Sequence, residues 1–360
     1  FEHGIIPEIQ SGEGYYPREY DWLGTCLSSF GICYNLDSLD RLDLPAPTTW
    51  DDLGRPGFQK GIALADPTKS GSVAKAFEML VQQKIHLQLA ANLSRKEACA
   101  KGWVEGLNLI QRIGSNARYF TDSASKVPHD VAQGNAIAGM CIDFFGRSYN
   151  EALKKENGNS RLKFISPVGG TSYSVDPVAI FEGAPNLKVA QEFVNFIFTK
   201  EGQMLWNARP GTKMGPKIRG LRRLPVRKDL YQEPFLSDMV DAEVMPYKIA
   251  SEVIYDYDLT GRHFTPLRNI IRAMCIDSHE EMKAAWEALI KADFPPEATA
   301  KFYDVSPVSY DAALSEIKVI LKSGDKIEVV RMMNDLGTYF RERYREAERM
   351  ALIVGKGDSK

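Results

Sequence analysis

Residues 60–72 read Lys-Gly-Ile-Ala-Leu-Ala-Asp-Pro-Thr-Lys-Ser-Gly-Ser, and a helical pattern follows over 73–83. The apolar run predicts a short buried strand, and the polar turn after it predicts the start of a helix. The first N–H groups of a helix have no partner within the helix, and the helix dipole favours negative charge there. This strand–turn–helix unit predicts an α/β fold in which Ser70, Gly71 and Ser72 accept an anion. The alternative is that they only cap the helix.

Two further units of the same kind follow. Residues 119–126 form a hydroxyl-rich turn before a helix, and the predicted strand 136–143 ends on a carboxylate followed by two phenylalanines. Ligands of open α/β sheets bind at the carboxyl ends of the strands. These ends supply the candidate residues Ser123, Ser125, Asp143, Phe144 and Arg147. The alternatives are helix capping for Ser123, Ser125 and Asp143, core packing for Phe144, and a surface ion pair for Arg147.

The remaining pattern completes an alternation of strands and helices. Residues 22–34 are typical of a pair of strands, Thr49 is the expected N-cap of a short helix, and 186–202 has the periodicity of one amphipathic helix. Beyond residue 209 the chain is mostly helical with polar faces. A basic cluster there is either a solvated surface or a partner contact, and it comprises Arg219, Arg222, Arg223, Arg227 and Lys228.

The composition of the chain limits the classes of protein and partner to consider. The chain has 360 residues, with 45 Lys and Arg against 47 Asp and Glu, so the formal net charge is −2. This balance does not favour nucleic acid as a partner, and the length suggests two domains. No run of 18 or more apolar residues is present.

Catalytic and metal-binding patterns are absent from the sequence. There is no glycine-rich nucleotide loop, no zinc-protease motif and no nucleophile elbow, and the five histidines are scattered. The five cysteines are an odd number without metal-ligand spacing, and burial as small apolar residues is expected. We therefore expect a protein that is not an enzyme and needs no cofactor.

Several motifs occur together in the order of a known family. They lie at residues 22–35, 49–53, 61–72, 131–138 and 175–186, and the match extends to Gln203. In this order they resemble the extracellular solute-binding proteins of ABC importers, and most nearly the ferric-iron-binding-like branch of the type II periplasmic binding proteins. The resemblance implies a small-molecule ligand, ABC permease subunits as partners, no nucleic acid, and a periplasmic or extracellular location.

The resemblance also implies a two-lobed α/β architecture of the type II periplasmic-binding-protein kind, which closes on its ligand in the cleft between the lobes. We expect residues 54–172 to form lobe 2, and 1–53 with 173–208 to form the remainder of lobe 1 and the hinge crossings. The first part of lobe 1 would precede Phe1. Residues 209–360 would form a mostly helical C-terminal extension that packs on lobe 1.

The same resemblance assigns roles to particular residues. Members of this branch cradle an anion where Ser70, Gly71 and Ser72 stand. Iron binders carry an adjacent tyrosine pair where this chain has Phe144 and Phe145, which cannot coordinate a hard cation. At the return crossing, the residues that either face the cleft or stabilise the hinge are Tyr173, Ser174 and Asp176.

The predicted function is therefore capture of a small polar or anionic organic solute. Ferric iron or another metal is the alternative, because Tyr15, Tyr16 and Tyr34 remain as candidate ligands. A hydrolase or transferase on the same scaffold ranks third, since a fold does not determine function.

Overall fold

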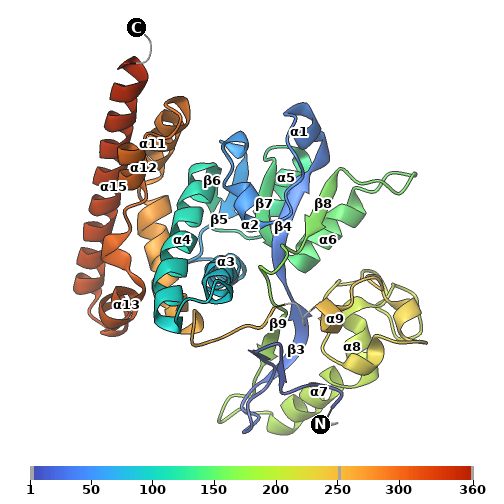
Figure 1. The fold of residues 1–360 in the computed structure, drawn as a ribbon. Helices are drawn as coiled ribbons and strands as arrows, with labels where there is room; N and C mark the ends of the chain where they lie inside the picture. The colour runs from blue at the N-terminus through green and yellow to red at the C-terminus, as the bar shows by residue number, and fades with distance from the viewer. Residues whose placement is uncertain (1–3, 250–252, 358–360) are drawn as a thin grey trace. The chain divides into compact units, whose positions relative to one another are not determined.

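The computed structural model describes residues 4–249 and 253–357, so His3 lies outside the described residues. The chain divides into two compact units. Unit 1 comprises Phe1–Ser29, Ile142–Ser148 and Thr171–Asp256. Unit 2 comprises Phe30–Cys141, Tyr149–Gly170 and Tyr257–Lys360. The chain therefore passes repeatedly from one unit to the other, as the rainbow colouring of Figure 1 makes visible.

Unit 2 is built on a five-stranded sheet with the order β6-β5-β7-β4-β8. Its strands are β4 (Phe30–Asn35), β5 (Ile62–Ala65), β6 (Ala117–Thr121), β7 (Ala138–Ile142) and β8 (Leu162–Ile165). Strand β5 is parallel to β6 and β7, whereas β8 is antiparallel to β4. Every residue of β5 is buried, which explains why this strand is an unbroken apolar run. The predicted α/β fold is confirmed.

Two long helices, α3 (Gly71–Ala90) and α4 (Arg95–Ser115), pack against one another. A Cβ atom at Gly102 would lie 2.5 Å from the Ile85 Cα, so glycine is what allows the two backbones to approach. The shorter helices of this part are α1 (Leu36–Arg41), α2 (Trp50–Leu53), η1 (Pro56–Phe58) and α5 (Lys126–Gln133). Thr49 is the N-cap of α2, as predicted.

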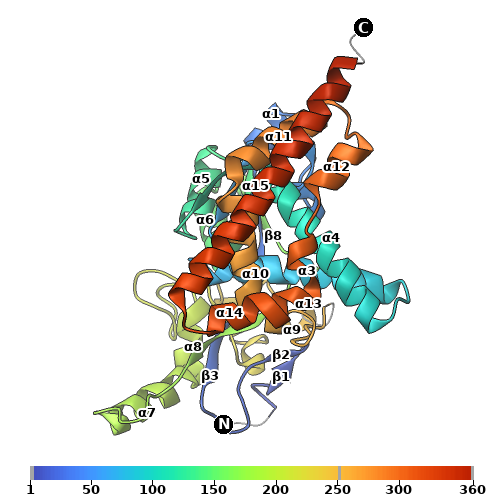
Figure 2. The same ribbon diagram turned by 90° about the vertical axis from the view of Figure 1, so that its left-hand side faces the viewer.

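The C-terminal extension is helical, as expected. Its elements are η4 (Gly261–His263), α10 (Phe264–Ile271), the π-helical turn η5 (Arg272–Ile276), α11 (His279–Lys291), α12 (Pro296–Phe302), η6 (Ser306–Val308), α13 (Tyr310–Ala312), the π-helical turn η7 (Ala313–Ile317), α14 (Lys318–Lys322) and α15 (Lys326–Gly357). In Figure 1, α4 lies between the sheet and the layer formed by α11, α12 and α15. Figure 2 shows the long α15 on the outer side of this layer.

The two compact units divide the predicted extension between them. Of the predicted extension, residues 209–256 group with unit 1 and residues from Tyr257 onward group with unit 2. Trp103 donates from Nε1 to the Val308 carbonyl at 2.8 Å, and Trp286 donates to Asn116 Oδ1 at 2.9 Å. Buried polar groups on α4 and just after it thus find their partners in the extension. Residues 30–53 also join unit 2, because β4 is a strand of its sheet.

Unit 1 holds two small sheets. Strands β3 (Leu23–Ser28), β9 (Ser174–Val178) and β10 (Leu224–Pro225) form an antiparallel sheet with the order β10-β3-β9. Strands β1 (Ile9–Gln10) and β2 (Glu13–Gly14) pair separately. The helical elements are α7 (Leu187–Ile197), α8 (Lys200–Asn207), η2 (Lys228–Leu230), η3 (Leu236–Asp238) and α9 (Pro246–Ile249). Helix α6 (Asp143–Ala152) begins in unit 1.

Two sequence predictions need correction in this region. The predicted strands within 22–34 exist but do not pair, because β3 and β4 belong to different sheets. The single helix predicted over 186–202 is broken between Ile197 and Lys200, where Thr199 caps α8 by accepting from the Gly202 N–H at 3.0 Å. Continuous helical periodicity concealed this break.

The interior is apolar and the cysteines belong to it. All five cysteines are buried and none is in a disulfide, as expected for small apolar side chains. Across the described ranges, no helix is both long enough and apolar enough to cross a bilayer.

Candidate functional site

The carboxyl ends of β5 and β6 carry the polar residues predicted from the sequence. Ser70 is the N-cap of α3 and accepts from the Val73 N–H at 3.3 Å, so its hydroxyl performs the capping role. A Cβ atom at Gly71 would meet nothing within 4 Å, and Ser72 is half-buried. The start of α3 therefore faces open space at Gly71, where unpaired helix N–H groups are available to an anion.

The turn between β5 and α3 is held by two arginines from the extension. Arg268 donates to the Pro67 and Thr68 carbonyls at 2.6 and 2.8 Å. Arg272 donates to Asp66 Oδ2 at 3.2 Å and to Thr68 Oγ1 at 3.3 Å, and its side chain is 40% exposed. The turn is thus a fixed structure with a partly exposed cation beside it. Nothing in the local sequence indicated these arginines, which follow Thr68 by about two hundred residues.

The second polar turn lies next to the first. Asp66 donates its N–H to the Thr121 carbonyl at 2.8 Å, which joins the ends of β5 and β6. Ser123 and Ser125 are exposed, and their hydroxyl oxygens lie 3.0 Å apart. We call residues 66–72 and 121–125 together the polar edge of unit 2. The structure thus brings all five predicted residues of this unit to one edge of the sheet.

Helix α5, behind the second turn, is fixed by a charged contact. Asp130 accepts from the Tyr119 hydroxyl at 2.5 Å and pairs with Lys126. Burial raises the pKa of Asp130, but the bonds from Lys126, Tyr119 and His129 outweigh it and lower the pKa to about 2. Lys126 is therefore already neutralised, and it is not a free cation for a ligand.

The predicted residues of unit 1 are arranged differently. Asp143 begins α6 instead of ending a strand, and Arg147 lies one turn later and donates to Asp143 Oδ2 at 2.8 Å. Arg147 Nε lies 3.3 Å from Asp241 Oδ2, and Arg222 donates to Asp241 Oδ1 at 2.6 Å. We call these residues, with Asn207, which donates to Asp241 at 3.0 Å, the buried charge cluster.

The buried charge cluster is neutral as a whole, with two carboxylates and two guanidinium groups. Asp143 and Asp241 have side chains that are at most 1% exposed, and Arg147 is 10% exposed. Burial lowers the pKa of Arg147, but Asp143 and Asp241 outweigh it and raise the pKa, so the guanidinium stays charged. Arg147 is occupied by protein carboxylates and by the Arg222 carbonyl, which describes a structural role.

Phe144 and Asp176 both contact Arg223. Arg223 pairs with Asp176 and donates to Ser28 Oγ at 2.9 Å, while its guanidinium carbon lies 3.8 Å from the Phe144 ring centre. The Asp176 side chain is 50% exposed and that of Arg223 is 23% exposed. Phe144 therefore supports a cation by stacking, a role that core packing alone did not suggest.

Tyr173 and Ser174 stand at the start of β9. Tyr173 is buried, and burial raises the pKa of its hydroxyl to about 12. Ser174 lines a hollow of about 340 Å³ together with Trp22 and Pro177. Of the predicted residues in unit 1, Phe144, Ser174 and Asp176 are half-buried, whereas Asp143, Arg147 and Tyr173 are buried.

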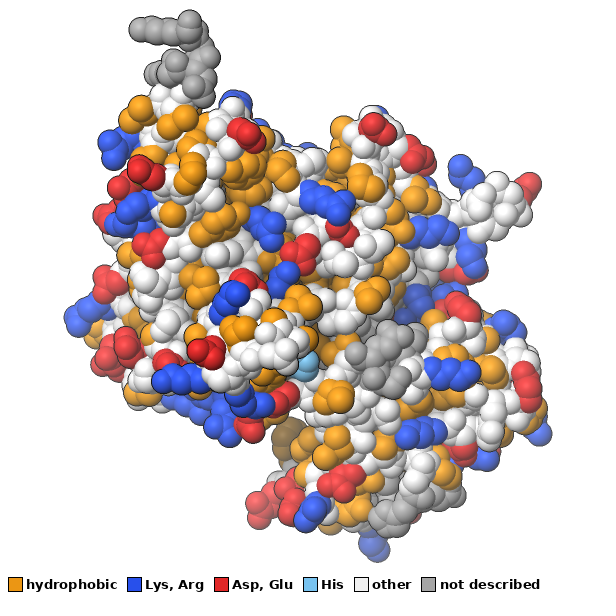
Figure 3. Space-filling model, in the orientation of Figure 1, with side chains coloured by type: hydrophobic (Ala, Val, Ile, Leu, Met, Phe, Trp, Pro, Cys, Tyr) orange, Lys and Arg blue, Asp and Glu red, His pale blue; other side chains and the backbone are white. Residues whose placement is uncertain are grey.

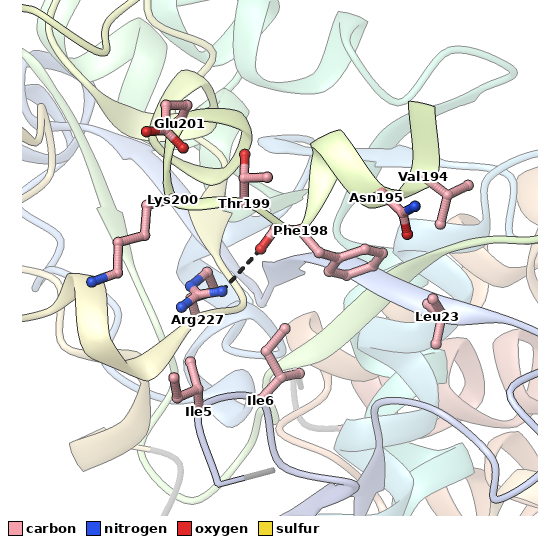
Figure 4. Close-up of a pocket in the computed structure, with 10 residues that line it drawn as sticks. All are labelled: Ile5, Ile6, Leu23, Val194, Asn195, Phe198, Thr199, Lys200, Glu201 and Arg227. Atoms are coloured by element: carbon pink, nitrogen blue, oxygen red, sulfur yellow. Dashed lines mark hydrogen bonds between the residues drawn. The ribbon is translucent and has the colours of Figure 1, made fainter. Parts of the chain in front are cut away.

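A larger hollow in unit 1 involves none of the predicted residues. It has a volume of about 450 Å³ and is lined by Ile5, Ile6, Leu23, Val194, Asn195, Phe198, Thr199, Lys200, Glu201 and Arg227. Figure 4 shows the Phe198 ring beside Leu23 and Val194, while Arg227 donates to the Phe198 carbonyl at 3.0 Å. Arg227 also binds both oxygens of Asp229, so its charge is compensated.

Of the three tyrosines that kept a metal site open, Tyr34 is buried in β4, and the other two make hydrogen bonds to backbone carbonyls. Tyr15 donates to the Tyr173 carbonyl at 3.2 Å, and Tyr16 donates to the Ile6 carbonyl at 3.3 Å. Burial raises the pKa of Tyr15, which disfavours a phenolate ligand. Among the residues of 4–249 and 253–357, no three His, Cys, Asp or Glu side chains gather as a metal site would require.

Comparison with known proteins identifies the family. Residues 10–238 match the model of the bacterial extracellular solute-binding proteins, which is more than half of the chain. The chain belongs to this family. Its members are binding proteins without catalytic activity, which agrees with the lack of catalytic motifs, and the family resemblance seen in the sequence is confirmed.

Individual relatives are distant. An uncharacterized protein of Haemophilus influenzae is 28% identical over 177 residues, which are 49% of this chain and 44% of that protein. The phosphoglycerate transport regulatory protein PgtC of Salmonella typhimurium is 22% identical over 183 residues, 51% of this chain and 40% of that protein. The chain thus spans less than half the length of the curated relatives it matches.

Solved structures show the same fold. An extracellular solute-binding protein of Bordetella parapertussis superposes with a TM-score of 0.50 and 14% sequence identity, covering 76% of this chain and 72% of that one. The periplasmic-binding-protein fold is therefore shown.

Proposed function

We propose that this chain is the solute-binding component of an ABC importer and that it takes up a small organic anion at the polar edge of unit 2. The observation that carries the importer role is the family match over residues 10–238. ABC permease subunits would be its partners, and the periplasm or the extracellular space its location. No catalytic residue, metal or cofactor is part of this proposal.

The ligand class rests on the chemistry of the polar edge. Gly71 leaves the first N–H groups of α3 uncovered, and α3 has twenty residues, so its dipole is fully developed. Arg272 lies beside the same turn but is already paired with Asp66 and Asp277. The donors offered to an anion are therefore the helix N–H groups and the hydroxyls of Ser72 and Ser123. Such a set of donors suits a phosphate or carboxylate group.

One relative points to the same class. PgtC is named for phosphoglycerate transport, and phosphoglycerate carries both a phosphate and a carboxylate. We therefore expect a small phosphorylated or carboxylated solute. Contacts to other polar groups of the ligand would let the protein distinguish it from inorganic phosphate.

Titration calorimetry with 3-phosphoglycerate, inorganic phosphate, ferric citrate and putrescine tests the proposal. Gly71→Asp places a carboxylate in open space at the start of α3 and should weaken anion binding about fivefold, because helix-terminus electrostatics contribute about 1 kcal/mol. Asn92→Asp makes the same charge change in the exposed turn after α3 and is the matched control.

Three outcomes would contradict the proposal. Equal affinity of the two variants would remove the polar edge as the binding site. Binding of ferric iron or putrescine in preference to anions would overturn the ligand class. Turnover of a chromogenic phosphate ester that is lost in Ser70→Ala would show an enzyme instead.

A further inference from the structure

The segment between α8 and β10 has an unusual charge pattern. Residues 209–223 contain six cationic side chains and no Asp or Glu, although the chain as a whole has a net charge of −2. The cations are Arg209, Lys213, Lys217, Arg219, Arg222 and Arg223. We call residues 209–221 the basic loop. We propose that the basic loop of unit 1 is a contact surface for an anionic phospholipid membrane.

The six cations fall into three groups, of which the first is Arg209 alone, which donates from Nη1 to the Ser237 carbonyl. Arg222 and Arg223 point to protein carboxylates, with Arg222 2.6 Å from Asp241. Lys213, Lys217 and Arg219 are exposed, and within residues 4–249 and 253–357 the structure contains no ion pair to any of the three. Two arginines thus anchor the end of the segment, and three cations remain for an external anion. Figure 3 shows Lys and Arg side chains on the visible face of unit 1 around α8 and α9.

Apolar side chains project between these cations. Ile218 is 82% exposed and stands between Lys217 and Arg219, and Leu221 is 53% exposed. An aliphatic group flanked by cations is the pattern of segments that lie in the membrane interface, where the chain enters the headgroup layer and the cations meet lipid phosphates. Lysine is depleted at the centre of protein–protein interfaces, so two exposed lysines beside Ile218 favour a lipid over a protein surface.

The basic loop has a defined shape. Gly211 donates to the Pro216 carbonyl at 3.1 Å, and Gly215 donates to the Thr212 carbonyl at 3.0 Å. Arg209 joins the loop to η3 by donating its N–H to the Asp238 carbonyl at 2.8 Å. The cations and Ile218 are therefore presented on an ordered backbone, so membrane contact would not require the loop to fold first.

Co-sedimentation with large unilamellar vesicles tests the proposal. The intact chain should bind vesicles in which a quarter of the lipid is phosphatidylglycerol and should not bind pure phosphatidylcholine. The triple variant Lys213→Gln, Lys217→Gln, Arg219→Gln should lower the partition coefficient about a hundredfold, since each cation near an anionic surface contributes about fivefold. Ile218→Ser should lower it by a smaller factor that is insensitive to salt.

The matched control changes three exposed lysines of unit 2 to glutamine. They are Lys96, Lys101 and Lys155. This variant has the same net charge as the loop variant and should retain vesicle binding, with circular dichroism showing that both are folded. Loss of binding in both variants would mean attraction by net charge and would overturn the proposal. Failure of the unaltered chain to bind phosphatidylglycerol vesicles at low salt would also overturn it and would leave an acidic protein surface as the occupant.

Discussion

His263 is buried between two aromatic rings in unit 2, and its burial makes stability depend on pH. Its ring lies 4.9 Å from that of Trp103 and 4.1 Å from that of Tyr310, between ring centres, and Nε2 lies 3.0 Å from the Tyr310 carbonyl oxygen. Nδ1 is buried without a hydrogen-bond partner. Burial, helped by the nearby Lys318, lowers the pKa of His263 to about 4 and outweighs the opposing effects of the Tyr310 carbonyl, Asp311 and Glu78.

The sign and size of the effect follow from linkage. Because the pKa falls from 6.5 to about 4 on folding, the unfolded chain binds more protons between these values. The contribution of His263 to the free energy of unfolding is therefore at its maximum above about pH 6.5 and declines as the pH falls toward 4. The whole shift corresponds to about 3 kcal/mol, and about 2 kcal/mol of it is lost by about pH 5.

His263→Phe keeps an aromatic ring in place and removes the titration. Urea unfolding followed by far-UV circular dichroism, at a series of pH values between about 8 and 5, measures the free energy of unfolding for both proteins. We expect the wild type to lose about 2 kcal/mol more than the variant over this range, because all other titrating groups are common to both. Parallel pH profiles would refute the reasoning, since they would mean that His263 titrates alike in the folded and unfolded states.

Two further predictions concern buried polar contacts. Arg147→Met leaves Asp143 and Asp241 without their shared cation and should destabilise the chain by about 3–5 kcal/mol, whereas the double variant with Asp143→Leu should recover part of this loss. Urea unfolding of both decides the point, and a milder single variant would mean that solvent reaches the cluster. Trp286→Phe removes the donor to Asn116 and leaves a cavity, so thermal unfolding should show a loss of about 2–3 kcal/mol. An unchanged melting temperature would show that the extension contributes little to unit 2.

The local parts of the fold were predictable because their signals lie close together in the sequence. The apolar run at β5 and the turn that follows it identified the strand, the start of α3 and the polar edge. Thr49 was recognisable as a cap because it directly precedes the helix and Asp52 stands three residues later, where it accepts from the Thr49 N–H. Each of these features is decided within a few residues.

Other features depend on contacts that no local pattern contains. The role of Asp143 was misread as the end of a strand, because whether a carboxylate follows a strand or starts a helix depends on its partner, here Arg147 and the distant Asp241. The unpaired strands β3 and β4 present a similar case. Only Ser29 separates the two strands. Strand β3 joins the sheet that contains β9, whereas β4 joins the sheet that contains β8.

The extension shows how far such contacts reach into the candidate site. Its helical segments were visible in the sequence, but their periodicity could not say which surface they cover. In the structure, Arg268 and Arg272 reach back to Pro67 and Thr68, the turn that starts the polar edge. Asp66 is 5% exposed, and Arg272 pairs with its carboxylate. Residues beyond the family match therefore hold the turn at the edge where we propose that the ligand binds.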